Sequence, residues 1–430
     1  MGSNAFRDCS SLTDLDFAPG IGVLGDWMFS RCISLQTVTV PAGIANVGEG
    51  VFAECQGLES AVIGSSGVQM FSGSLNLRTL TVPEEAASVH ERALEGHSSL
   101  KTVIIAGPAD IGARAFDGCT ALTNLKMTGD VKRIGDMAFA DCSELTALAL
   151  PDSVEHIGDS AFMNCFKMTI AKLPASLRTV GSGAFVKCFG ITELVLPHGT
   201  ESVGTDAFKW CGNISSVRIG CGSVSLGLGA LSDCGDVEKL VFDSGSVSTE
   251  GDPFEGTVFK NLEIAKGTVF GGDMLFPLEE YRFTLSDKNL SNIVKDIMTV
   301  TVGKMSKEGL DPDTARLIGF ADIIEVRFDG MGDLSDPVRV MKKVDSGVRS
   351  AHVLYDMSDG EPVRKTFRMQ ADPGTEQYRW AVFDLDSKES AFCFTVGSQA
   401  TIPDSPALGL TIGILGTICA AAYALMQRRS

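Results

Sequence analysis

The chain carries a repeat of 23 residues, and no other feature of its sequence constrains the fold as strongly. One repeat position is phenylalanine in most copies, namely Phe6, Phe29, Phe52, Phe71, Phe116, Phe139, Phe162, Phe185, Phe208 and Phe254, with Leu94 and Leu231 in the same place. Two steps are shorter, at 19 residues (Phe52 to Phe71) and 22 residues (Leu94 to Phe116). One such unit cannot bury its apolar side chains alone, but stacked units can, because each coil covers its neighbour. The repeat therefore predicts a solenoid of about eleven to twelve coils over residues 1–268.

The best-formed unit spans residues 135–157 and reads GDMAFADCSELTALALPDSVEHI. Its L-x-x-L-x-L segment predicts a short strand whose side chains alternate between inward and outward positions. The phenylalanine and the cysteine three residues later predict a single helical turn with both side chains on one face. Asp136 precedes that turn as a candidate cap, and Gly135 is expected to adopt a turn conformation that other residues resist.

Cysteine forms a second column, three residues after the phenylalanine, at Cys9, Cys32, Cys55, Cys119, Cys142, Cys165, Cys188, Cys211 and Cys234. Three interpretations are open for this column: buried thiols that pack as small hydrophobic groups, disulfides between successive coils, and metal sites. The odd number of members and the strain expected in each pair argue against disulfides. The C-x-x-C pairs that zinc sites favour are absent. We therefore favour buried thiols.

The repeat unit, written I-G-x-x-A-F-x-x-C-x-x-L-x-x-L-x-L-P, closely resembles the BspA-like (Treponema-type) leucine-rich repeats, which occur in surface proteins of bacteria, some archaea and some protists. The resemblance covers roughly three fifths of the chain and recurs in nearly every coil. It implies a solenoid with a parallel sheet on one face and a role in adhesion or in contact with host or other cells. It brings no catalytic residues.

One outward position in each strand defines the predicted partner-binding face: Asp16, Thr39, Val62, Thr81, Ile104, Lys126, Ala149, Lys172, Val195, Arg218 and Val241. This face is rich in small and β-branched side chains, mixed in charge, and without the aromatic cluster that dominates many binding hot spots. Two interpretations stay open for it. One is a shallow contact surface for a protein or glycan partner, and the other is a solvated sheet with ordinary β-branched residues.

The 23-residue period ends after Phe254, and residues 269–280 are expected to form a cap or linker. Residues 281–398 contain seven or eight segments with strand-like patterns, separated by turn signals such as Asp329-Gly330 and Asp359-Gly360. This density of short strands predicts an all-β sandwich. The pattern resembles, loosely, the immunoglobulin-like modules that precede membrane anchors in many surface proteins.

Residues 407–426 form a stretch of 20 residues without a charge, which is long enough to span a bilayer as one transmembrane helix. Arg428 and Arg429 follow it, and positive residues stay on the cytoplasmic side. We therefore expect residues 399–406 to be a stalk, residues 427–430 a cytoplasmic tail, and the preceding part of the chain to lie outside the cell. The segment 402–406 reads IPDSP and departs from the sortase motif L-P-x-T-G, so we expect the helix to be retained. The alternative is a C-terminal anchor of the processed archaeal type.

Display outside a cell needs an export signal, and the first residues, MGSNAFRDCSS, contain none. They also begin in the middle of a repeat, so we expect the natural chain to start further upstream. Asn213 and Asn289 lie in N-x-S sequons and are possible glycosylation sites.

Charge and motifs restrict the possible functions further. The formal net charge of -18 disfavours binding to nucleic acid, whose phosphates it repels. The sequence shows no metal-ligand spacing and no nucleotide-binding or nucleophile motif, so we expect no enzyme, no metal and no cofactor. We predict a membrane-anchored surface protein that binds a protein or glycan partner. The alternatives are a structural envelope protein that self-associates through its repeats and, less favoured, an enzyme within the sandwich.

Overall fold

The computed structural model describes residues 2–107, 110–170, 172–220, 222–271, 274–278, 281–285 and 295, and from residue 297 on it describes strands that end at residue 396. The chain divides into two compact units. The first comprises Met1–Val237 and Gly245–Thr257, and the second comprises Glu238–Ser244 and Val258–Ser430.

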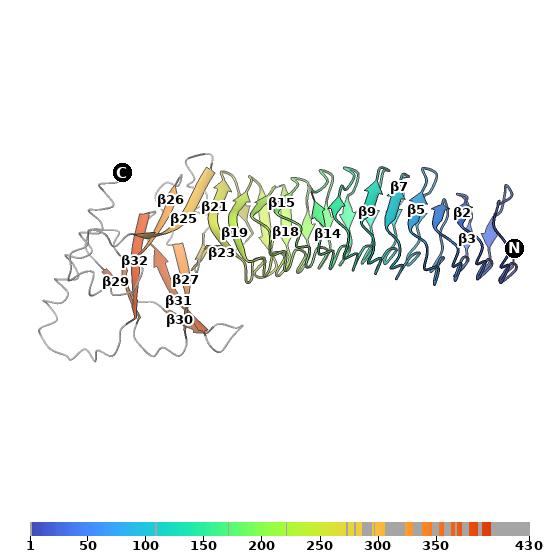
Figure 1. Ribbon diagram of the computed structural model, residues 1–430. Helices are drawn as coiled ribbons and strands as arrows, with labels where there is room; N and C mark the ends of the chain where they lie inside the picture. The colour runs from blue at the N-terminus through green and yellow to red at the C-terminus, as the bar shows by residue number, and fades with distance from the viewer. Residues whose placement is uncertain are drawn as a thin grey trace, which may run out of the picture. The chain divides into compact units, whose positions relative to one another are not determined.

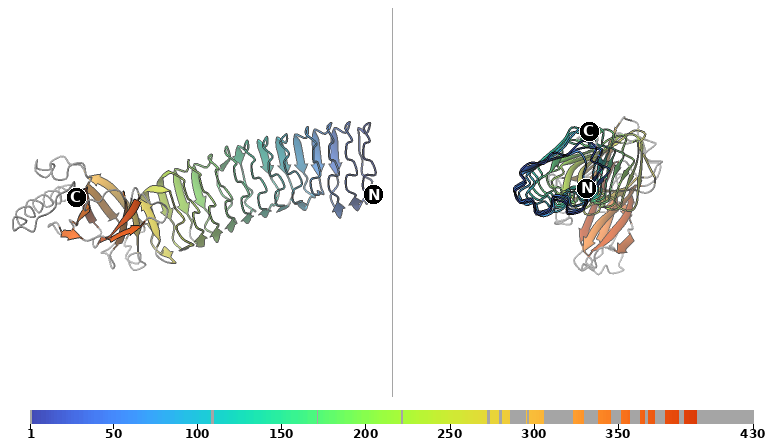
Figure 2. Two further views of the ribbon diagram at one scale, coloured as in Figure 1. Left: turned by 90° about the horizontal axis from the view of Figure 1, so that it is seen from below. Right: turned by 90° about the vertical axis from the view of Figure 1, so that its right-hand side faces the viewer.

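The first unit is a stack of coils, with the coils following one another along the chain (Figures 1 and 2). One side of the stack carries parallel strands with alternating exposed and buried residues, as the L-x-x-L-x-L pattern predicts. Five of them form one sheet: β2 (Thr37–Val40), β4 (Ser60–Ile63), β5 (Thr79–Val82), β7 (Thr102–Ile105) and β9 (Asn124–Met127). Further along, β11 (Ala147–Leu148) pairs with β13 (Thr169–Ile170), and β15 (Glu193–Leu196) pairs with β17 (Ser216–Ile219). The predicted parallel β-solenoid is confirmed. We call this side the strand face.

A second parallel ladder runs along another side of the same coils, where sequence analysis expected none. The ladder is formed by the Val, Ile or Leu at the end of each repeat unit, together with the adjacent residues. Its strands are β6 (Ser88–Val89), β8 (Asp110–Ile111), β10 (Arg133–Ile134), β12 (His156–Ile157), β14 (Thr179–Val180), β16 (Ser202–Val203), β18 (Ser223–Leu226) and β20 (Ser246–Thr249). Most of these strands are only two residues long, too short for their period to be read from sequence.

The short 19-residue coil interrupts this second ladder. Before it, β1 (Val23–Leu24) pairs with β3 (Asn46–Val47), and the ladder resumes only at β6. Two hydroxyls of the short coil compensate for missing main-chain partners. The Ser65 hydroxyl accepts a hydrogen bond from the Ile44 amide at 3.1 Å, and the Ser66 hydroxyl accepts one from the His90 amide at 2.7 Å. The stack therefore tolerates a shorter coil because side chains satisfy the freed backbone groups.

The segment around the phenylalanine forms the third side of the coil, which we call the turn edge. It is a run of turns and not a helix. Alternate amides donate to the next coil, so that Arg114, Phe116 and Gly118 pair with the carbonyls of Asp136, Ala138 and Ala140 at 2.8–2.9 Å. The predicted cap residue acts between coils: the Asp136 carboxylate accepts a hydrogen bond from the Asp159 amide of the following coil at 2.9 Å.

Two columns of side chains fill the core. The phenylalanine rings stack from coil to coil, with centroids 5.0–5.7 Å apart and ring planes within 16° of parallel. The column of cysteines runs beside them. All nine are free thiols, and all but Cys9 are buried. Each buried thiol lies within 3.1–3.4 Å of the main-chain carbonyl oxygen of the phenylalanine-position residue in the preceding coil and donates to it. The buried-thiol interpretation is confirmed for these eight.

The recurrent glycine of the repeat has a different role from the one expected. Gly135 and Gly158 do not adopt the left-handed conformation. A Cβ atom on Gly135 would lie 2.7 Å from the main-chain nitrogen of Ala113 in the preceding coil, and one on Gly158 would lie 2.6 Å from that of Asp136. Glycine is needed at this position because the coils approach each other too closely for any side chain.

The second unit contains antiparallel strands. One series of pairings runs β29 (Val363–Lys365), β28 (His352–Asp356), β32 (Glu389–Val396), β26 (Ile323–Asp329), β25 (Ile297–Met305) and β21 (Val258–Ala265). Another runs β23 (Leu275–Leu278), β24 (Tyr281–Thr284), β27 (Val338–Asp345), β31 (Tyr378–Leu385) and β30 (Arg368–Ala371). These pairings agree with an all-β region. The face-to-face packing of two sheets into a sandwich stays a prediction.

An aromatic cluster lies near the start of the second unit. The rings of Phe242, Phe270 and Phe276 make edge-to-face contacts with centroids 5.2–5.8 Å apart. Phe270, in β22 (Val269–Phe270), and Phe276 fall in the region predicted to be a cap or linker. Their burial indicates that this part of the chain packs as a core and is not an extended linker.

Several predictions fall outside the described residues. They concern Asn289, the stalk at residues 399–406, the membrane helix at 407–426 and the tail at 427–430. Within the part of the chain that the structure describes, there is no helix with the length and apolar character needed to cross a bilayer.

Candidate functional site

The strand face brings the predicted partner-binding residues into continuous columns. Thr39, Val62, Thr81, Ile104 and Lys126 are aligned from strand to strand by the pairing of β2, β4, β5, β7 and β9. Val195 is likewise aligned with Arg218 between β15 and β17. Because side chains on one face of a parallel sheet stack in register, a partner would meet rows of short side chains with one lysine and one arginine among them.

Most of the remaining predicted residues are also accessible, although not all belong to strands. Ala149 and Lys172 are exposed just beyond β11 and β13, and Asp16 is exposed before the first strand of the stack. Val62, Thr81 and Ile104 are half-buried.

The assignment of Val241 to the exposed face is wrong. This side chain is 7% exposed, and its neighbours Leu240 and Phe242 are buried as well. The strand that contains them, β19 (Asp236–Phe242), loses its alternation at this end, because side chains on both of its faces are covered. Alternation of apolar and polar residues along a strand cannot reveal that another part of the chain buries the outward side chains.

The strand face is interrupted between β13 and β15. A 23-residue step would place Ile170 beside Ala147, yet Ala147 pairs with Thr169, and Ile170 pairs with Leu148. A slip of one residue moves a side chain from one face of a sheet to the other. Ile170 is therefore half-buried instead of pointing outward as the period predicts.

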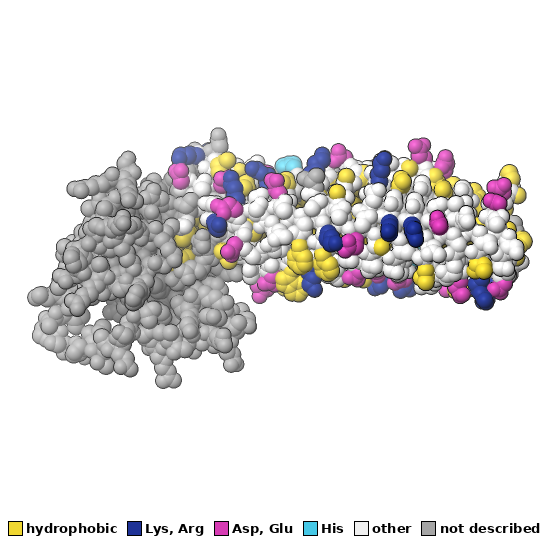
Figure 3. Space-filling view, in the orientation of Figure 1, with side chains coloured by type: hydrophobic (Ala, Val, Ile, Leu, Met, Phe, Trp, Pro, Cys, Tyr) yellow, Lys and Arg dark blue, Asp and Glu magenta, His cyan; other side chains and the backbone are white. Residues whose placement is uncertain are grey.

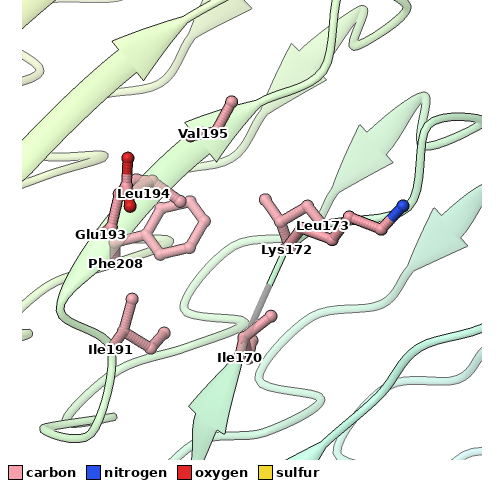
Figure 4. Close-up of a pocket in the computed structure, with 8 residues that line it drawn as sticks. All are labelled: Ile170, Lys172, Leu173, Ile191, Glu193, Leu194, Val195 and Phe208. Carbon is pink, nitrogen blue, oxygen red and sulfur yellow. The ribbon is translucent and has the colours of Figure 1, made fainter.

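A small cavity opens at this interruption. Its volume is about 90 Å³, and Figure 4 shows the side chains around it. Ile170, Leu173, Ile191, Leu194 and Val195 supply its aliphatic wall, together with the fully buried ring of Phe208. Two charged residues also line it, Lys172 and Glu193, and both are exposed.

The cavity suits a side chain better than a small molecule. Small-molecule sites commonly measure about 300–1,000 Å³, several times this volume. An apolar hollow with a cation and an anion beside it resembles instead the pockets that receive one anchor residue of a protein partner. Lys172 already has a carboxylate nearby, with its ammonium 3.6 Å from Asp152.

The other candidate groups have simpler surroundings. Asn213 is exposed, and its side-chain amide donates a hydrogen bond to the Phe189 carbonyl at 2.7 Å. His97 occupies a cysteine position of the core, is 6% exposed, and has an Nε2 atom without a hydrogen-bond partner. Among the described residues, no three His, Cys, Asp or Glu side chains gather closely enough to hold a metal ion.

Sequence analysis missed a group of exposed aromatic residues on the turn edge. Phe166 and Phe189 are each 40% exposed, and Trp210 is 43% exposed. The predicted partner-binding positions carry no aromatic residue, and these three residues lie outside them. A signal was present, since the repeat position of Phe166 and Phe189 is polar or glycine in most other coils, for example Ser143 and Gly212.

Comparisons with solved structures found leucine-rich-repeat proteins. One from T. pallidum is 25% identical, with 42% of this chain and 73% of that chain covered and a TM-score of 0.30. One from Bacteroides ovatus is 20% identical, with 52% and 75% covered and a TM-score of 0.32. A leucine-rich cell surface protein from Faecalibacterium prausnitzii is 20% identical, with 51% and 72% covered and a TM-score of 0.24. No curated protein matches the chain.

The family comparison is decisive. The family model of the BspA type leucine-rich repeat region matches residues 1–101, 67–188, 109–238 and 155–277, which overlap and together span the chain from residue 1 to residue 277. The match thus covers more than half of the 430 residues and contains every coil described above. The chain belongs to the BspA-type leucine-rich-repeat family.

Proposed function

We propose that the protein is a non-enzymatic binding or adhesion protein, and that its strand face docks a protein or glycan partner. The observation that carries the proposal is the cavity between β13 and β15, an apolar hollow on the strand face. The aligned rows from Thr39 to Lys126 and from Val195 to Arg218 provide a broad contact area on either side of it. Long solenoid faces bind through many weak contacts, to which one filled pocket adds specificity.

We also propose that the protein acts at a cell surface. In this arrangement, residues 407–426 cross the membrane, and an immunoglobulin-like β-sandwich over residues 281–398 separates the solenoid from it. The charge-free stretch of 20 residues, followed by Arg428 and Arg429, supports the anchor. The antiparallel pairings of the second unit support the sandwich.

Binding can be tested with two matched variants of the full-length chain on glycan and surface-protein arrays. Val195→Glu places a charge at the cavity, whereas Thr39→Glu places the same charge on the same face, away from it. We expect Val195→Glu to weaken binding at least tenfold, since burying a carboxylate in an apolar site is costly, and Thr39→Glu, at the far end of the contact area, to weaken binding several times less. Unchanged binding by both variants, or signals that come only from self-association, would contradict docking at the strand face.

Location is tested separately, by treating intact source cells with protease and identifying the released peptides by mass spectrometry. We expect peptides from the solenoid and none from residues 427–430. If the protein is present in the lysate and no solenoid peptide is released, the surface proposal is wrong, whatever the binding assay shows.

A further inference from the structure

Three successive coils each carry one exposed aromatic residue on the turn edge, and two lysines lie against the last of the three. Phe166 and Phe189 occupy the same position in successive coils, and their rings stack with centroids 5.9 Å apart. Phe189 follows Lys187 by two residues, and the ammonium of Lys187 lies 5.1 Å from the centre of the Trp210 ring. Lys209 approaches the same ring to 5.1 Å. We call these five residues the aromatic–lysine patch. Figure 3 shows hydrophobic side chains gathered over the coils that carry β14 and β15.

Trp210 sits at a backbone position that disfavours it. Its φ is 60°, in the left-handed region, and the same position is left-handed in the other coils. Most of those coils carry residues that tolerate this conformation, such as Gly118, Asp141, Asn164 and Asp233. A bulky aromatic residue in this region is strained, and the fold does not need it, since glycine and aspartate serve elsewhere. Strain retained at an exposed position indicates a functional demand.

The geometry of the patch selects among partners. A sugar ring packs against an open aromatic face, but both lysines lie over the ring of Trp210, and Phe166 and Phe189 cover each other by stacking. A partner therefore meets ammonium groups beside the Trp210 ring, and two phenylalanine rings that each cover one face of the other. Such a surface suits apolar side chains placed beside carboxylates, which the lysines attract and the cation–π contacts hold in place.

The positive charge of the two lysines also favours a partner that carries carboxylates. The chain has a formal net charge of -18, so a local pair of lysines beside three aromatic rings is opposite in sign to the molecule as a whole. Lys209 already contacts the Asp206 carboxylate at 3.3 Å, and a partner carboxylate would share or replace that contact. A second copy of this chain would bring the same strong negative charge, which favours a different protein as the occupant.

We propose that the aromatic–lysine patch is a second docking surface, whose occupant is an acidic polypeptide segment that inserts an apolar side chain beside Phe189 and Trp210. Its carboxylates pair with Lys187 and Lys209. The surface lies on the turn edge and is distinct from the strand face, so that the solenoid has two binding sides.

The test begins with a random-peptide phage library selected on the full-length chain after depletion on the Trp210→Gly variant. We expect the enriched peptides to combine acidic residues with a large apolar one. The best peptide is then labelled, and its binding is measured by fluorescence anisotropy. We expect Trp210→Gly and Lys187→Glu to lose at least tenfold in affinity, and added salt to weaken binding.

Two controls separate this proposal from folding defects and from the strand face. Trp210→Gly removes a strained residue, so its thermal midpoint should not fall. Val195→Glu, the variant that tests the strand face, should bind the peptide as the wild type does. The proposal is overturned by enriched peptides without acidic residues, by no enrichment, or by Trp210-dependent binding of hyaluronan or phosphatidylserine vesicles in place of peptides.

Discussion

At the scale of single residues, one position of the core column decides how each coil is linked to the coil before it. The buried cysteines donate to a main-chain carbonyl, and burial raises the pKa of the Cys55 thiol to about 12. Coils without cysteine keep the same link by another donor. The Ser74 hydroxyl donates to the Phe52 carbonyl at 2.8 Å, and the Thr257 hydroxyl donates to the Leu231 carbonyl. The column thus selects a small donor that remains uncharged.

His97 breaks that rule and makes the solenoid sensitive to acid. Burial lowers the pKa of its imidazole from 6.5 to about 4. The folded state therefore favours the neutral ring, and protonation of His97 does not reduce the free energy of unfolding above the unfolded-state pKa near 6.5. As the pH falls from 6.5 to about 4, the free energy of unfolding decreases by on the order of 3 kcal/mol, at ~1.4 kcal/mol per pKa unit. Urea unfolding of the wild type and of His97→Cys between pH 7 and pH 4 measures this loss.

We expect His97→Cys, which restores the residue found in other coils, to lose less stability than the wild type over that range. The carboxylates titrate in both proteins, so the difference between the two curves isolates the imidazole. If the free energy of unfolding falls equally with pH in both proteins, protonation of His97 does not destabilise the folded state. The absence of a hydrogen-bond partner for its Nε2 atom would then need another explanation.

At the scale of one coil, the backbones of neighbouring coils approach each other closely at the glycine that opens the repeat unit. The prediction concerns Gly135→Ala, whose new Cβ would lie 2.7 Å from the Ala113 nitrogen and 2.8 Å from the carbonyl carbon of Gly112. Both atoms belong to main chain and cannot move aside alone, so two coils must separate. We expect a loss of ~1–3 kcal/mol, the usual cost of overpacking, measured by urea unfolding.

Gly22→Ala is the matched control for that substitution. Gly22 is not left-handed, and nothing lies within 4 Å of the position that its Cβ would take, so the same added methyl group should be tolerated. Equal stability of the two variants would show that close approach does not explain the glycine position.

At the scale of the whole solenoid, each coil contacts only its neighbours along the stack, and stability should therefore be nearly additive in coils. Deletion of residues 135–157 removes one complete unit and joins Ile134 to Gly158, which recreates the Ile-Gly junction of the repeat. We expect a folded protein with an unchanged circular dichroism spectrum per residue. Its midpoint should fall by roughly 2–4 °C for each kcal/mol lost.

The informative comparison is deletion of residues 135–146, which removes fewer residues but puts the phenylalanine and cysteine columns out of register. That variant should lose cooperative unfolding. If the two deletions behave alike, chain length and not register governs the stack, and the columns matter less than the structure implies.

The site was predictable only in part. The outward columns from Thr39 to Lys126 follow from strict alternation within each strand, a local property. The cavity does not, because it arises where Ile170 pairs with Leu148 and the register of β13 slips by one residue. The burial of Val241 and the exposure of Trp210 likewise depend on what covers, or fails to cover, a position.

The sequence by itself determined the coil period, the phenylalanine and cysteine columns and the strand face, because each of these repeats a residue type at fixed spacing and burial follows from that type. Only the tertiary structure decided the second parallel ladder, the role of Gly135 and the left-handed strain at Trp210. These features depend on main-chain distances between neighbouring coils, and such distances are set when one coil meets the next. A single unit, read alone, contains the side chains but not the contacts between backbones.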